Sequence, residues 1–108
     1  MPHTFESALN NDFIERSEAT HAGYSFWLKG IPVEIKVVIS INPVEGGFNF
    51  KTSHVIHTPK QIGAYRPSHA WGDYPEYALH RAVTSITGEY GIAVKAGLKP
   101  SSDWLVTA

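Results

Sequence analysis

Residues 33–41 alternate between apolar and more polar side chains, and this pattern constrains the fold more than any other in the chain. The odd positions carry only β-branched aliphatic residues, namely Val33, Ile35, Val37, Ile39 and Ile41. The residues between them are Glu34, Lys36, Val38 and Ser40. Side chains two residues apart share one face of a strand, so the segment predicts a strand with one buried face and one wetter face.

Two neighbouring segments carry the same period of two and predict two further strands. Residues 24–29 alternate between Tyr, Phe and Leu on one side and Ser, Trp and Lys on the other. Residues 48–57 alternate in the same way, beginning with Phe48. Short connections and one shared apolar face are typical of an antiparallel sheet. We therefore predict a three-stranded antiparallel meander.

The connections between these segments predict which residues pair. Gly30 falls at the first central position of a two-residue turn, where a type II′ turn requires glycine. This turn places Phe26 opposite Ile35. The longer loop after the central strand places Ile41 opposite Phe48. A slip of one residue would mix the two faces of the sheet, so we expect these registers.

The C-terminal half predicts a long helix over residues 74–96. Asp73 as N-cap and Pro75 in the first turn favour a helix start, and Gly97 suits the position just past the end. An apolar stripe with helical spacing runs along one face. Its members are Leu79, Ala82, Val83, Ile86, Tyr90 and Ala93.

A shorter helix is expected over residues 4–16, where Phe5, Leu9 and Phe13 recur every four residues. The run Asn10-Asn11-Asp12 has poor helix propensity, so this helix must depend on tertiary contacts. The chain is thus predicted to form a single α+β domain over residues 1–108. The expected order is α-β-β-β-α, with the long C-terminal helix covering one face of the sheet.

This element order resembles that of double-stranded RNA-binding modules, which also run helix, three strands, helix. Those modules begin their second helix with glycine and a lysine cluster that meets phosphates. Here the second helix begins Asp73-Tyr-Pro-Glu76, and these carboxylates would repel a phosphate backbone. We therefore carry no function over from the resemblance.

Composition excludes several classes of function. The chain has 108 residues, no cysteine and a net charge of −1. Without cysteine there are no disulfides, thiolate metal sites or cysteine nucleophiles. A nearly neutral chain has no global attraction for nucleic acid or anionic lipid. The apolar run Val37–Ile39 is far too short to cross a bilayer and no signal peptide is evident, so we expect a cytoplasmic protein with no membrane partner.

The connection between the third strand and the last helix is the main candidate site. It spans residues 59–72, and loops of this length in compact domains are often functional. Tyrosine, tryptophan and arginine dominate binding hot spots, because they combine a large rigid area with directed hydrogen bonds. The loop supplies the binding candidates Lys60, Tyr65, Arg66, His69 and Trp71. In the alternative interpretation, Tyr65 and Trp71 only pin the loop to the body of the domain.

Our leading hypothesis is a small non-enzymatic domain that binds another protein through this loop. The sequence contains no Gly-x-Ser-x-Gly, no phosphate-binding glycine loop and no His-Glu-x-x-His, so an enzyme is the less favoured class and no cofactor is expected. Size and lack of motifs extend the hypothesis to accessory or inhibitor proteins of phages and mobile elements. Ile92, on the polar side of the last helix, indicates either a homodimer contact or a break in that helix.

Two alternatives remain open. The outer sheet face would suit nucleic acid through phosphate contacts and base stacking, although an ordinary solvated face explains the same residues. The residues concerned are Trp27, Lys29, Lys36 and Lys51. The second alternative is a histidine-based metal hydrolase, which requires His69 and His80 to approach each other. We assign no metal ligand.

Overall fold

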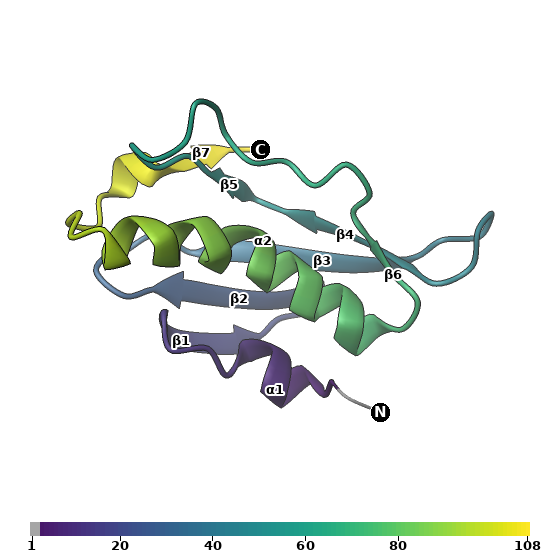
Figure 1. Cartoon of the computed structure of the whole chain (residues 1–108). Coiled ribbons are helices and arrows are strands. Elements are labelled where there is room, and N and C mark those ends of the chain that lie inside the picture. Colours follow the sequence, from purple (N-terminus) through teal and green to yellow (C-terminus); the bar gives the residue numbers. More distant parts are fainter. Residues whose placement is uncertain (1–2) are drawn as a thin grey trace.

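The alternating segment forms strand β3 (Ile35–Ile41), the central strand of a five-stranded antiparallel sheet (Figure 1). The computed structural model describes residues 3–108. The sheet order is β1-β2-β3-β4-β6. The other strands are β1 (Ile14–Ala19), β2 (Gly23–Leu28), β4 (Phe48–Thr52) and β6 (Trp71–Gly72). The predicted meander is confirmed as the middle of this sheet, but the predicted number of three strands is wrong.

Both predicted registers are confirmed. Phe26 pairs with Ile35, and Ile41 pairs with Phe48. The β2–β3 ladder stops at the Phe26–Ile35 pair, because β3 begins only at residue 35. The predicted two-residue turn is wrong, because the Ile31 amide donates to the Leu28 carbonyl at 3.2 Å and closes a turn one residue earlier. Gly30 is the second central residue of this turn and has a φ of 80°, the left-handed backbone that glycine tolerates best.

The predicted helix over residues 4–16 is wrong beyond residue 9. Helix α1 (Phe5–Leu9) begins after Thr4, whose hydroxyl accepts a hydrogen bond from the Ser7 amide. Asn11 then ends helical hydrogen bonding, since its Oδ1 accepts from the Phe13 amide at 2.9 Å. The chain continues as β1, in which every residue after Ile14 is exposed. A strand without a buried face has no apolar alternation, so no periodic pattern predicts it.

The predicted strand over residues 48–57 is divided in two. β4 ends at Thr52, and β5 (His54–Ile56) leaves the large sheet. β5 pairs instead with β7 (Leu105–Thr107) in a separate two-stranded sheet. A 3-10 turn, η1 (Ser102–Trp104), leads into β7. The last part of the segment predicted as one strand therefore pairs with the C-terminal strand β7.

Helix α2 (Pro75–Lys95) matches the predicted C-terminal helix and runs unbroken through Gly88. All six residues of the predicted stripe are buried. The N-cap residue is Tyr74 and makes no side-chain cap bond, so Asp73 does not cap the helix as predicted. Gly97 has a φ of 88° just past the C-cap, as its position predicts.

The helices and the sheet form two layers around one core. Figure 1 shows α2 lying across the sheet, with α1 beside it near β1. Trp104 closes the core next to the C-terminal half of α2, edge-on to Tyr90 at 5.9 Å between ring centroids. Tyr90 also donates its hydroxyl proton to the Lys29 carbonyl. Within residues 3–108, no helix combines the length and apolarity that a bilayer crossing would need.

Candidate functional site

The predicted 59–72 loop is tied to the domain at both ends. Gln61 clamps the first turn, because its amide nitrogen donates to the Ile56 carbonyl at 3.0 Å and its oxygen accepts from the Thr58 amide at 2.7 Å. The Tyr65 amide also donates to the Ile56 carbonyl, at 2.9 Å. At the other end, β6 pairs with β4. The backbone is therefore fixed at several points, while side chains between them face outward.

Four of the five predicted binding residues are exposed. They are Lys60, Tyr65, Arg66 and His69. Tyr65 retains 45% of its surface although its backbone bridges to β5. The pinning alternative therefore holds for the Tyr65 backbone but not for its side chain. A phenol ring fixed at its base and open to solvent is suited to contacting a partner.

Trp71 is placed differently and anchors the loop. Its indole Nε1 donates to the Gly46 carbonyl at 2.8 Å, and its ring is half-buried. The ring packs so closely on Gly47 that a Cβ there would lie 2.5 Å from it. The His69 ring stacks on the Trp71 ring, with centroids 5.5 Å apart and nearly parallel planes. Trp71 thus joins the loop to the β3–β4 hairpin.

Arg81 of α2 holds the same end of the loop from the helix side. Its guanidinium donates to the backbone carbonyls of His69, at 2.9 Å, and Trp71. In the sequence Arg81 is one of several polar residues opposite the apolar stripe, and nothing in the pattern distinguishes it. Only the approach of the loop to the helix gives it this function.

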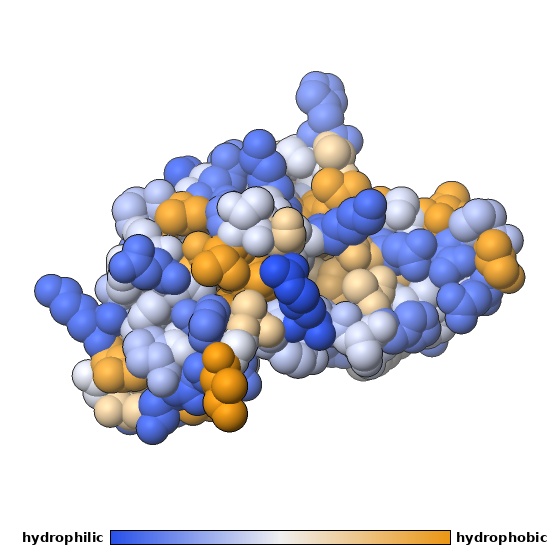
Figure 2. All heavy atoms as spheres, turned by 90° about the horizontal axis from the view of Figure 1, so that it is seen from above, coloured by the Kyte–Doolittle hydropathy of each residue, from blue (hydrophilic) through white to orange (hydrophobic). Residues whose placement is uncertain are grey.

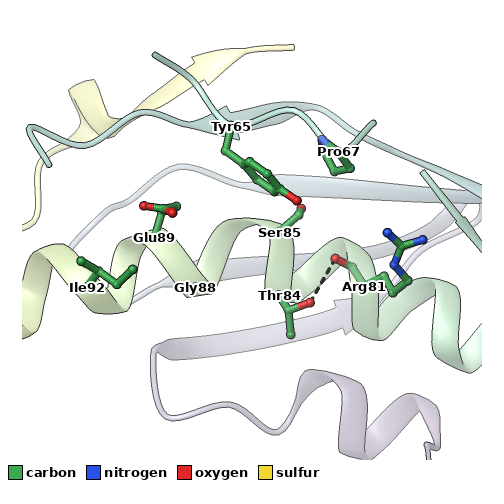
Figure 3. A pocket seen from close by; sticks show the side chains of 8 residues that line it. All are labelled: Tyr65, Pro67, Arg81, Thr84, Ser85, Gly88, Glu89 and Ile92. Carbon is green, nitrogen blue, oxygen red and sulfur yellow. Dashed lines mark hydrogen bonds between the residues drawn. The ribbon is translucent and has the colours of Figure 1, made fainter. Parts of the chain in front are cut away.

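A groove of about 380 Å³ lies between the loop and helix α2 (Figure 3). Tyr65 and Pro67 form its loop side. The helix side consists of Arg81, Thr84, Ser85, Gly88, Glu89 and Ile92. Figure 3 shows the Tyr65 side chain extending from the loop toward the helix. At Gly88 no atom lies within 4 Å of where a Cβ would stand, so the helix surface is bare at this point.

Exposed apolar side chains accompany the loop and the groove. Ile62 is fully exposed in the loop, and Ile92 is exposed on the groove side of α2. Figure 2, which views the molecule from above, shows apolar side chains in separate clusters among polar ones rather than one continuous patch. Ile62 was not among the predicted binding residues, although an isoleucine between Gln61 and Gly63 lies outside any periodic segment and could have indicated it. Ile92 does not mark a break in α2, since the helix is continuous there.

The outer sheet face offers exposed cations but a partly covered aromatic ring. Lys29, Lys36 and Lys51 are exposed. Trp27 is half-buried, and the Arg16 guanidinium lies 3.7 Å above its ring. This cation–π contact occupies a ring face that a base would need for stacking. The geometry therefore supports phosphate contacts better than base stacking on this face.

The two histidines of the hydrolase alternative have separate partners. His69 lies 3.8 Å from Glu45 and stacks on Trp71. His80 stacks on His3, with ring centroids 4.0 Å apart. In the part of the chain that the structure describes, no three histidine, aspartate or glutamate side chains are grouped so that they could hold one metal ion.

We expect His80 to make stability fall on acidification. Burial lowers the pKa of His80 below its ordinary value of 6.5, and the charge of His3 lowers it further. The folded protein therefore binds fewer protons than the unfolded chain at pH values just below 6.5, and its free energy of unfolding decreases as the pH falls through this range. Thermal unfolding between pH 7 and pH 5 should show a smaller decrease in midpoint for His80→Gln than for the parent chain.

His21→Gln supplies the matched control for this measurement, because His21 is exposed in the turn between β1 and β2. Its variant should keep the pH dependence of the parent. An unchanged slope in His80→Gln would contradict the assignment.

The loop and the groove together form one surface with apolar, aromatic and charged side chains. The fixed backbone of the loop presents the Tyr65 ring at the groove and an exposed isoleucine elsewhere on the loop. Arg81 and Glu89 give the groove charges of both signs. Comparisons with protein-family models, curated proteins and solved structures find no match to this chain.

Proposed function

We propose that this domain binds another protein through the surface formed by the 59–72 loop and the groove beside α2. The observation that carries the proposal is a loop with a fixed base whose Ile62, Tyr65 and Arg66 side chains face solvent. Ordering the backbone in advance lowers the entropic cost of binding. Of these exposed residues, the tyrosine and the arginine belong to the types that contribute most to binding energy.

The groove adds a receptacle to this projecting surface. Three exposed apolar side chains, Ile62, Tyr65 and Ile92, belong to the loop or line the groove. Single exposed apolar residues are ordinary, but several on one loop and on the groove next to it favour an interaction site. A domain that only binds would act as an accessory or inhibitor protein, because it would occupy the surface of its partner.

Site-specific photo-cross-linking tests the proposal. A photoreactive amino acid placed at Ile62 should capture a discrete protein in cells of the native host. The same group at Val38, exposed on the outer sheet face, should not. Adding Arg66→Ala to the Ile62 variant should reduce capture roughly 5- to 10-fold, the effect of losing a hot spot of more than about 1 kcal/mol.

Two controls decide how the result is interpreted. The thermal midpoint of Arg66→Ala should remain close to that of the parent, because an exposed side chain contributes little to folding. Nuclease treatment should leave capture at Ile62 intact. Capture of a protein at Val38 alone would contradict the proposal, because it would place the partner on the outer sheet face. A signal that nuclease removes would also contradict it and would favour nucleic acid.

A further inference from the structure

Strand β1 forms an open edge of the large sheet. It pairs with β2 on one side, and within residues 3–108 no strand pairs with its other side. Figure 1 shows β1 at the margin of the sheet, and residues 15–19 are all exposed. An open edge presents a row of amide and carbonyl groups that a further strand can use.

The hydrogen bonding of β1 identifies which backbone groups are available. The Thr20 amide donates to the Gly23 carbonyl at 2.8 Å, so Thr20 directs its backbone groups toward β2. In an antiparallel strand, the backbone groups of successive residues point alternately toward the paired strand and away from it. Glu18 therefore also directs its backbone groups toward β2, and those of Ser17 and Ala19 point to the open side.

The charges on β1 are arranged symmetrically about Ser17. Arg16 and Glu18 flank it and, two residues apart, share one face of the strand. Their side chains are 62% and 54% exposed, and Arg16 Nη1 lies 3.8 Å from Glu18 Oε2. The Trp27 ring supports the Arg16 guanidinium from below, at 3.7 Å. Arg16 is thus held in place and remains accessible.

We propose that two copies of this chain associate through antiparallel pairing of β1 about a two-fold axis at Ser17. Ser17 would then exchange both backbone hydrogen bonds with Ser17 of the second copy. Arg16 would lie opposite Glu18 of the second copy, and the symmetry repeats this pair. These are non-hydrogen-bonded positions, where opposing side chains approach most closely. The two sheets become one continuous sheet.

Charge selects this register over its neighbours. An axis at Arg16 would place the two arginines opposite each other, and an axis at Glu18 would oppose the two glutamates. Like charges directly opposite each other are destabilising. Charged edge strands usually discourage association, but here the charges of one β1 strand are complementary to those of an antiparallel β1 strand in a second copy. A strand of another protein would need the same alternation of signs to pair equally well.

Charge reversal with mixing tests this proposal. The parent chain should show a reversible monomer–dimer equilibrium in sedimentation analysis between roughly micromolar and millimolar concentration, since a single strand pair buries less area than a standard interface. Arg16→Glu and Glu18→Arg should each weaken self-association about tenfold or more, because each opposes like charges twice. An equimolar mixture of the two variants should form a heterodimer, since each supplies the sign that the other lacks.

A backbone variant makes the test independent of charge. Ser17→Pro removes an amide proton that points to the open side, so it should abolish association while the β1–β2 ladder remains. Far-ultraviolet circular dichroism checks that each variant is folded. A parent chain that is monomeric up to about millimolar concentration, or a dimer unaffected by charge reversal, would overturn the proposal. Because these measurements use the purified chain alone, their outcome is separate from that of cross-linking at the loop.

Discussion

Replacing Trp104 by alanine is expected to lower the free energy of unfolding by about 3–5 kcal/mol, the usual cost of deleting a large buried aromatic side chain. Trp104 is only 4% exposed and meets Tyr90 edge-on. Its carbonyl accepts a hydrogen bond from the His57 amide at 2.8 Å, so the residue also joins η1 to the end of β5. The total free energy of unfolding of a domain of this size is roughly 5–15 kcal/mol, so the variant should be partly unfolded at moderate temperature.

Urea unfolding of Trp104→Ala and Trp104→Phe provides the comparison. Phenylalanine keeps an aromatic ring next to Tyr90 and should recover a large part of the loss. A loss below about 1 kcal/mol for the alanine variant would show that Trp104 is not a core residue.

The second large effect concerns Gly72, where β6 touches helix α2. A Cβ at this position would lie 2.6 Å from the Ala78 nitrogen and 2.8 Å from its Cα. These are backbone atoms of a helix and cannot turn aside as a flexible side chain can. Gly72→Ala should therefore cost about 1–3 kcal/mol, as overpacking typically does, and should loosen the end of the 59–72 loop.

Gly88→Ala is the matched control, since the same chemical change should have the opposite sign. The Cβ at Gly88 meets nothing within 4 Å, and the residue lies inside an otherwise regular helix. Alanine should therefore stabilise the domain by about 0.5–1 kcal/mol. Thermal unfolding measures both variants, and exchange of the Phe50 amide, which donates to the Ala70 carbonyl at 3.0 Å, should accelerate only in Gly72→Ala. Equal effects at the two glycines would contradict this account.

The parts of the fold that could be predicted are those in which one periodic face is buried. The alternation around β3 predicted the central strands with their registers, and the stripe along α2 predicted that helix. Burial imposes such patterns, so they are visible in the sequence. β1 and β6 lack them, because every residue of β1 after Ile14 faces solvent and β6 has only two residues. No local sequence pattern predicts that β5 pairs with the C-terminal strand β7.

The candidate site was predictable to the same limited degree. Loop length and residue types indicated the segment but left open whether its side chains were packed or exposed, and the structure shows Tyr65 and Arg66 exposed. They did not separate Trp71, which anchors the loop, from the exposed residues around it. Arg81 and Gly88 became relevant only because the loop passes over α2, and this contact joins residues distant in sequence. Such a tertiary contact leaves no periodic trace.

The indole of Trp71 gives the 59–72 loop and the β3–β4 turn a common mechanical base. Its bond to Gly46 and the proximity of His69 to Glu45 connect the two segments outside the hydrophobic core. Val44, exposed near the tip of that turn, is therefore linked to the loop through these two contacts. A molecule that contacts the β3–β4 turn would therefore also lie beside the end of the loop that Trp71 holds.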